Sequence, residues 1–397
     1  AVQAPDRALD ENPVLVERDD ASQRVRIEAI VDQCRGRSVA REDLVRRKSR
    51  IDPGSQHFGE IAPEERVLGY RRNKNRFGIR NHVAVVPTVF CANRVAAEIA
   101  RGFDDVRWGP ANENRVLHLG HTVGCCSIGF DEETAIDVLM GLAQNPNVGG
   151  VLLVHLGCGQ LCSGCGSTGK PSSSGRLNLL LRSLSSVLKA DTIIHSKGSL
   201  SAIADGREKV ARMIAKLEAQ ERTEFHVGNL AIGVMNGSSD PTSGLFANPA
   251  VGHFSDWLLE RGGRVAFSQT VEMLGAEDAV LERLGTKDSP ARQRSVRHRV
   301  EQQLWRTTAM RVAVEQLGIE SEPTPGNRRG GISTLAEKSI GTLFKIGHDP
   351  RHAIVDVLPH GKTMTSKSGI HLVDGPGQDV LCLTALSAAG AHLILFT

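Results

Sequence analysis

The residues of this chain best suited to chemistry are cysteines that follow apolar runs. Cys91 follows VAVVPTVF, the pair Cys125 and Cys126 follows VLHLGHTVG, and Cys158 follows VLLVHLG. Runs rich in Val and Leu that end at a glycine or a polar residue are typical of buried parallel strands. Ligands of open α/β sheets bind beyond the carboxyl ends of such strands. Thiols at these positions therefore indicate a metal site or a reactive thiol.

The densest cysteine block is Cys158-x3-Cys162-x2-Cys165. Three thiolates at this spacing could hold an iron–sulfur cluster with one iron left open, or contribute to a mononuclear metal site. The alternative is a tight, glycine-rich loop that happens to contain sulfur. The overlapping GCGSTGK has the glycine and lysine spacing of a phosphate-binding loop, but Pro171 stands where a Ser or Thr would hold magnesium. We therefore do not expect a nucleotide there.

His121 lies four residues before Cys125, so one loop offers an imidazole and a thiol. Neutral imidazole and thiolate are good ligands for iron or zinc. In contact, the two could also act as a base and a nucleophile. A histidine with a structural role after a strand is the plainer interpretation.

Two glycine-rich loops have the composition of anion-binding segments. NGSSDPTSG (236–244) follows the strand run LAIGVM, and its backbone N–H groups could cradle a carboxylate, although an ordinary turn has the same composition. In GNRRGGISTLAEKS, Ser333 or Thr334 could cap a helix that continues through Lys338. Glu272 follows another strand run and could serve as a ligand or a base. These segments favour a carboxylate-bearing substrate.

Strand runs alternate with helical stretches from Leu68 onward, which predicts an α/β fold with two parallel-sheet halves and an N-terminal helical arm. We expect an arm or partial domain over 1–67, a first α/β domain over 68–227 and a second over 228–397. Strands are expected over 83–89, 151–156, 230–235, 265–268, 353–358 and 393–396. Helices are expected over 92–102, 132–143, 176–189, 207–220, 253–261 and 291–316.

Composition excludes several functional classes. The net charge of +3 and an aromatic content of 4% argue against a nucleic-acid partner. No apolar stretch approaches the ~20 residues of a membrane span, and the first residues lack a signal-peptide layout. Free cysteines then fit a reducing cytoplasm. Because the chain begins at Ala1 and stops after the apolar run HLILF, we expect it to be a fragment, truncated at the C-terminus.

An ordered series of motifs resembles the altronate/galactarate dehydratase family, which also includes the large subunit of sulfolactate sulfo-lyase. The matching stretches are GYRRNKNRFGIRN (69–81), TVFC (88–91), GHTVGCC (120–126), VLLVHLGC (151–158), NGSSDPTSGLFANPAVG (236–252), SQTVEMLGAE (268–277), PTPGNRRGGISTLAEKSIG (323–341) and DGPGQDVLCLTALSAAGAHLILFT (374–397). The resemblance implies a lyase that removes water, or sulfite in one branch, from a 2-hydroxy acid, with dependence on divalent iron or a similar metal. By position, the family motif residues are Cys91, His121, Cys125, Cys158, Asp240, Glu272, Asn327 and Lys338.

The chain also departs from the family. Asn236 stands where many members have a cysteine, and Cys126, Cys162 and Cys165 look like additions. The small N-terminal domain of the family is not recognisable in residues 1–67. Since that domain is a separate chain in the two-subunit branch, a small partner subunit is expected, together with a homo-oligomer.

These observations lead to one hypothesis, a metal-assisted β-elimination from a sugar acid. A cation on the carboxylate would stabilise the enediolate formed when a base removes the α-proton. The expected metal ligands, for Fe²⁺ or a cluster, are Cys91, His121, Cys125, Cys158, Cys162 and Cys165. The residues expected to transfer protons are Glu272, Lys338 and His121. The residues expected to bind substrate are Asn236, Ser239, Asp240, Asn327 and Arg328. The alternatives are a sulfite-eliminating lyase, an iron–sulfur protein and an inactive sugar-acid-binding subunit.

Overall fold

The computed structural model describes residues 65–72, 76–123, 130–156, 189–194, 198–237, 239–284, 290–318, 323–365, 367–375 and 377–397. Residues 64–397 form one compact unit. The predicted N-terminal arm lies outside the described residues except for its last three positions, and the predicted helix over 176–189 lies outside them apart from Lys189. Across the described ranges, no helix combines the length and the apolar composition that a membrane span needs.

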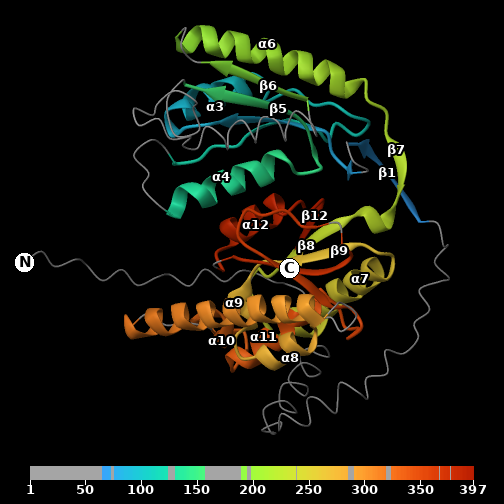
Figure 1. Cartoon of the computed structure of the whole chain (residues 1–397), viewed down its shortest axis with the longest axis vertical. Helices are drawn as coiled ribbons and strands as arrows, with labels where there is room; N and C mark the ends of the chain where they lie inside the picture. The colour runs from blue at the N-terminus through green and yellow to red at the C-terminus, as the bar shows by residue number, and fades with distance from the viewer. Residues whose placement is uncertain are drawn as a thin grey trace, which may run out of the picture. The chain divides into compact units, whose positions relative to one another are not determined.

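The first sheet is parallel, with the strand order β4-β3-β5-β6. Its strands are β3 (His82–Pro87), β4 (Val116–His118), β5 (Val148–His155) and β6 (Lys189–Ile194). The helices that cover it are α3 (Asn93–Arg101), α4 (Phe130–Ala143) and α6 (Ser199–Glu218). Alternate residues of β3 and β5 point to opposite faces. One face packs against α3 and α6 and the other against α4, so both faces are buried (Figure 1).

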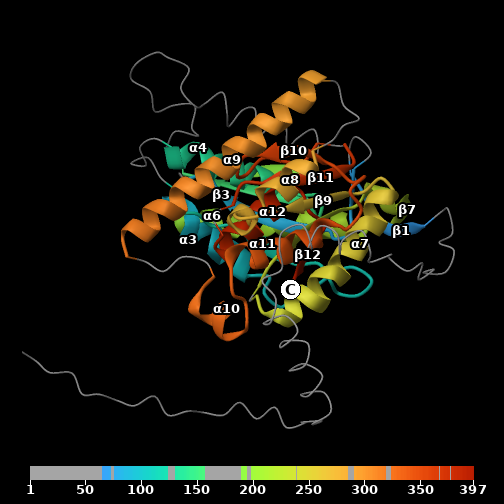
Figure 2. The same cartoon turned by 90° about the horizontal axis from the view of Figure 1, so that it is seen from below.

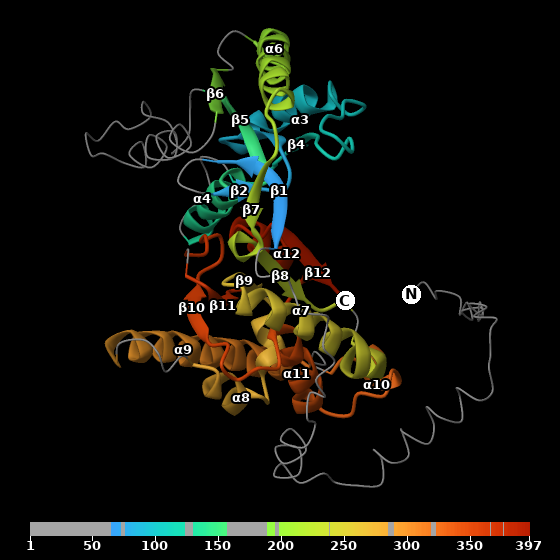
Figure 3. The same ribbon diagram turned by 90° about the vertical axis from the view of Figure 1, so that its right-hand side faces the viewer.

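The second sheet is also parallel, with the strand order β10-β11-β9-β8-β12. Its strands are β8 (Ala231–Met235), β9 (Arg264–Phe267), β10 (Ile354–Leu358), β11 (Gly369–Val373) and β12 (Leu393–Phe396). The longer helices around it are α7 (Asn248–Glu260), α9 (Pro290–Gln316) and α12 (Asp379–Ala388). Residues of α7 and of the long helix α9 share a core with one face, and α12 packs on the other (Figures 2 and 3). The predicted α/β fold is confirmed.

A small antiparallel sheet, in the order β2-β1-β7, was not predicted. It comprises β1 (Arg66–Arg71), β2 (Phe77–Gly78) and β7 (Thr223–His226). The rings of Phe77 and Phe225 stack with centroids 4.5 Å apart. A Cβ at Gly69 would lie 2.4 Å from the Phe225 ring, so the pairing requires glycine there. Because β7 is remote in sequence from β1, a local hydrophobic pattern does not predict their pairing.

The expected strands and helices within the described ranges are confirmed, with ends that differ by a few residues, and α6 and α7 begin earlier than expected. The strands β4, β6 and β11 were missed because they are short or carry polar residues. Histidine stands in the middle of β11 (Gly369–Val373), yet all five positions are buried.

The two parallel sheets are joined next to the amino-terminal ends of β5 and β12. The Asn145 side chain donates to the carbonyls of Ser387 at 2.8 Å and Ala391 at 3.0 Å. The Asn147 side chain donates to the His392 carbonyl at 2.9 Å. Both strands begin at this junction, so their carboxyl ends are the ends farther from it.

We expect Asn145→Ala to lower the free energy of unfolding by about 1–3 kcal/mol, because two buried carbonyls lose their donors. Urea unfolding measures the change. Gln302→Ala, at an exposed position of α9, is the control and should change stability by less than ~0.5 kcal/mol. Equal effects of the two substitutions would contradict the proposed role of this junction.

Candidate functional site

The clearest candidate is a buried ion pair beyond the carboxyl end of β9. Glu272 lies in the short helix η6 (Thr270–Met273), and Lys338 lies in α11 (Leu335–Leu343). The Lys338 ammonium is 3.1 Å from a Glu272 carboxylate oxygen, and the two side chains are only 5% and 8% exposed. Taking two charges out of water is costly, so a pair buried at a strand end is a functional-site candidate. The structure thus brings together two residues predicted for proton transfer.

Lys345 adds a second buried amine, which sequence reasoning missed. It lies in η7 (Phe344–Ile346) and is fully buried. Its Nζ donates to the carbonyls of Met235 at 2.7 Å and Thr397 at 3.0 Å, which ties the ends of β8 and β12 together. Burial lowers the pKa of Lys345 to about 7, and the nearby Glu272 carboxylate opposes this shift. The sequence feature that could have indicated this burial is the position of the lysine inside the apolar run TLFKIG.

Asn236 follows the last residue of β8 and is hydrogen-bonded to residues after β9 and in α11. The Gln269 side chain accepts a hydrogen bond from the Asn236 backbone N–H and donates one to its carbonyl, the latter at 3.0 Å. The Asn236 side chain donates to the Thr342 hydroxyl at 2.7 Å. Residues after β8 and β9 are therefore fixed to each other and to α11.

The other residues predicted to bind substrate lie around the same strand ends. The Asp240 carboxylate accepts from the Thr242 hydroxyl at 2.6 Å and from the Ser243 backbone N–H at 2.9 Å. These bonds hold the pKa of Asp240 below its usual value. The Asn327 side chain donates to the Ser239 carbonyl at 2.9 Å and so joins the two glycine-rich loops. Arg328, at the end of α10 (Pro325–Arg329), is exposed.

The amino end of α11 is capped by protein groups. The Thr334 hydroxyl accepts from the Glu337 backbone N–H at 3.1 Å, which confirms Thr334 as the N-cap. The Glu337 carboxylate accepts from the backbone N–H and the hydroxyl of Ser333. A carboxylate from the protein thus lies just before the start of α11, where Ser333 supplies its hydrogen bonds.

A second group of predicted residues lies at the carboxyl edge of the first sheet. Cys91 is exposed in η2 (Phe90–Ala92), just beyond β3. The His121 backbone N–H donates to the Asn93 side chain at 3.2 Å, which brings the segments after β3 and β4 together. The His121 ring donates through Nε2 to the Pro87 carbonyl at 2.9 Å and accepts at Nδ1 from the Val123 N–H at 3.1 Å. A metal-ligand role for His121 would require one of these bonds to break.

Two further histidines stand at this edge, His118 at the end of β4 and His155 at the end of β5. Burial lowers the pKa of His118, His121 and His155, so all three are neutral at pH 7. Neutral imidazole and thiol are the kinds of donor that iron or zinc prefers, but the described side chains of this edge do not by themselves bring three ligand atoms together. The remaining predicted ligands, Cys125, Cys158, Cys162 and Cys165, lie outside the described residues.

Comparison with known proteins decides the family. The profile of the D-galactarate dehydratase/altronate hydrolase second domain matches residues 69–218, and that of the D-galactarate/altronate dehydratase C-terminal domain matches residues 227–397. The chain is 31% identical over 328 residues to the β subunit of (2R)-sulfolactate sulfo-lyase from Chromohalobacter salexigens, a match that covers 81% of this chain and 75% of the relative. The chain belongs to the altronate/galactarate dehydratase family.

Two altronate dehydratases are longer relatives within this family. The enzyme of Bacillus subtilis is 32% identical over 329 residues, covering 83% of this chain and 61% of the relative. The enzyme of Escherichia coli is 28% identical over 359 residues, covering 88% of this chain and 65% of the relative. The chain therefore spans less than two thirds of the length of either altronate dehydratase. The Glu272–Lys338 pair lies within the part that matches the C-terminal domain of the family.

We expect the stability of the protein to rise with pH above about 7, because of Lys345. Its pKa of about 7 in the folded chain lies below the ordinary lysine pKa of 10.5, so between these values the unfolded chain binds more protons. One such group changes the free energy of unfolding by up to ~1.4 kcal/mol per pH unit. Lys345→Met should remove this slope. Urea unfolding of both proteins across that range measures it, and parallel pH profiles would contradict the assignment.

Proposed function

We propose that this chain is the catalytic part of a hydro-lyase that eliminates water from a sugar acid of the altronate or galactarate type. The supporting observation is the Glu272–Lys338 pair, a base and an acid within 3.1 Å in a buried site at strand ends. Two of the relatives are named altronate dehydratase, which supports the same substrate class.

The proposed reaction is a β-elimination. The Glu272 carboxylate takes the proton from the carbon next to the substrate carboxylate. The bond between the neighbouring carbon and its hydroxyl oxygen then breaks, and Lys338 supplies the proton with which the oxygen leaves as water. The enol that remains tautomerises to a 2-keto acid. Glu272 thus ends protonated and Lys338 ends neutral, and proton exchange with solvent restores both groups.

Burial makes the pair suitable for this role. Burial keeps water away from the pair, and the neighbouring amines of Lys338 and Lys345, when protonated, stabilise negative charge that develops beside them. The fixed segments after β8 and β9 would hold the substrate between Asn236, Ser239, Asp240, Asn327 and Arg328.

The proposal also includes a divalent metal, most simply Fe²⁺, held at the first sheet edge. The residues that would hold it are Cys91 and His121 together with Cys125 and Cys158, and an iron–sulfur cluster through Cys162 and Cys165 is the alternative form. When bound, such an ion would polarise carboxylate and hydroxyl oxygens as a Lewis acid. A homo-oligomer, a small partner subunit and a cytoplasmic location remain predictions from the sequence.

Sulfite is the alternative leaving group. The similarity to the sulfolactate sulfo-lyase subunit favours this second candidate, because that relative is covered over 75% of its length. The same base and the same developing charge would serve, and only the group that departs differs. An assay that offers altronate, galactarate and sulfolactate to the purified protein, with 2-keto acid and sulfite measured separately, distinguishes the two.

Glu272→Gln should lower kcat by about 10²–10⁴-fold, because the amide keeps the shape of the side chain but cannot accept the proton. The control is Glu282→Gln at an exposed position of α8 (Glu277–Glu282), which should leave the rate within twofold. 2-Keto acid formation measures both rates. A Glu272→Gln protein with the wild-type rate would exclude Glu272 as the base.

Protein purified without oxygen should contain iron, and removing the iron with a chelator should abolish 2-keto acid formation until Fe²⁺ is restored. Elemental analysis before and after treatment provides the measurement. Full activity in metal-free protein would show that the elimination proceeds without a metal.

A further inference from the structure

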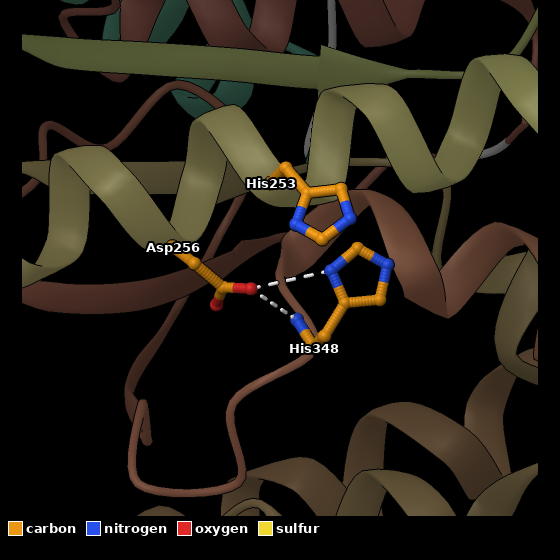
Figure 4. Close-up of side chains that lie close together, drawn as sticks. All are labelled: His253, Asp256 and His348. Atoms are coloured by element: carbon orange, nitrogen blue, oxygen red, sulfur yellow. Dashed lines mark hydrogen bonds and ion pairs between the residues drawn. The ribbon is translucent and has the colours of Figure 1, made fainter. Parts of the chain in front are cut away.

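A third cluster of chemically capable residues lies away from both strand edges. His253 and Asp256 lie in α7 (Asn248–Glu260), three residues apart and therefore on one face of the helix. His348 lies just after η7 (Phe344–Ile346) and points toward both of them (Figure 4). One ligand atom from each residue can be chosen so that all three atoms lie within 4.8 Å of one another.

The spacing of the donor atoms suits a transition metal. His348 Nδ1 is 3.2 Å from Asp256 Oδ2, a hydrogen bond that an ion bound by both atoms would replace. Two ligands at the ~2.0–2.1 Å of zinc–nitrogen and zinc–oxygen bonds in a tetrahedral site lie about 3.3 Å apart. The His253 ring stacks beside the His348 ring, with centroids 4.5 Å apart and the planes 32° from parallel. A small rotation of the exposed His253 side chain would complete a site with two imidazoles and one carboxylate.

The backbone around the cluster leaves space for these side chains. Gly347 has φ +108°, and a Cβ there would lie 2.3 Å from an Asp256 oxygen. A Cβ at Gly252 would lie 2.5 Å from the His348 ring. Glycine at both positions therefore leaves the room in which the Asp256 carboxylate and the His348 ring lie together.

Several hydrogen bonds fix the Asp256 carboxylate. The His348 ring hydrogen-bonds to one of its oxygens at 3.2 Å. The His352 ring donates to the second carboxylate oxygen at 2.9 Å, an arrangement that orients a carboxylate beside a metal. His348 and Asp349 also donate backbone N–H groups to the carboxylate, at 2.7 and 3.3 Å.

The surrounding charge decides which ions the cluster suits. Arg283 donates to the carbonyls of Ile346 and Gly347 and so places a positive charge near Asp256. This charge offsets the carboxylate, so calcium and magnesium, which depend on anionic oxygen, gain little. Zinc and similar ions gain from coordinate bonds to imidazole.

We propose that His253, Asp256 and His348 bind a divalent ion of the zinc class, separate from the metal expected at the first sheet edge. The plainer interpretation is a turn at 347–349 capped by Asp256. That reading explains the carboxylate and the backbone N–H groups but not the second imidazole of His253 beside His348. The ion would link α7 to the segment that carries Lys345, whose carbonyl accepts from the Ser255 hydroxyl of α7 at 2.6 Å. The proposal does not depend on the proposed catalytic activity.

The test uses chelator-treated protein titrated with Zn²⁺ by calorimetry and with Co²⁺ by absorption. Sites that contain thiolates give sulfur-to-cobalt charge-transfer absorption, whereas an imidazole–carboxylate site does not. We expect one equivalent of Co²⁺ to bind without this absorption, in competition with Zn²⁺ but not with Mg²⁺ or Ca²⁺.

His253→Gln should lower the affinity of this site for Co²⁺ and Zn²⁺ by at least ~10–100-fold, the loss that follows removal of an outer-shell partner. The substitution is at an exposed position, so circular dichroism should match that of the wild type. His348→Gln should have the same effect on binding. His298→Gln, at an exposed position of α9, and Cys91→Ser should retain the site. Unchanged binding in a folded His253→Gln protein, or thiolate absorption for every bound ion, would overturn the proposal.

Discussion

The second sheet depends on how it buries the amine of Lys345. Its N–H groups donate to the carbonyl of Met235, the last residue of β8, and to that of Thr397, just beyond β12. A fully charged ammonium in this position would be costly, and burial has moved its pKa to about 7. A neutral amine still has two N–H donors, so both hydrogen bonds persist when the proton leaves. The strand ends therefore stay joined in either protonation state.

This arrangement gives Glu272 its electrostatic setting. Lys338 pairs with the carboxylate directly, and Lys345 lies near enough for the two charges to influence each other. Burial lowers the pKa of Lys345 to about 7, so the net charge around Glu272 depends on pH near neutrality. The rigid connection of Asn236 to Gln269 and Thr342 keeps the strand ends fixed while that charge changes. A preorganised site of this kind lowers the reorganisation needed as charge develops on a substrate.

Sequence patterns predicted the parallel architecture well because buried strands leave continuous apolar runs, as in β3, β5 and β8. They failed where a strand carries a polar residue that the fold neutralises. His371 in β11 is fully buried, and burial lowers its pKa to about 4, so the ring is an uncharged core residue. Lys345 escaped notice for a related reason, since a lysine is ordinarily solvated and only the three-dimensional packing shows that this one is not. Glu272 and Lys338 were identified through motif order, but their contact depends on how α11 packs onto η6.

The cysteine-rich edge and the acid–base pair belong to different sheets. The sequence hypothesis assigned all candidate residues to one reaction, although their convergence depends on strand order, which the sequence does not show. The polar junction through Asn145 and Asn147 lies at the opposite ends of β5 and β12, so the strands carry their carboxyl ends away from it. His155 is the last residue of β5 in the first sheet, and Glu272 follows β9 of the second sheet. The contacts that hold the Glu272–Lys338 pair come from η6 and α11 of the second sheet, so the proposed metal-assisted reaction requires the substrate to reach from this pair to the first sheet edge.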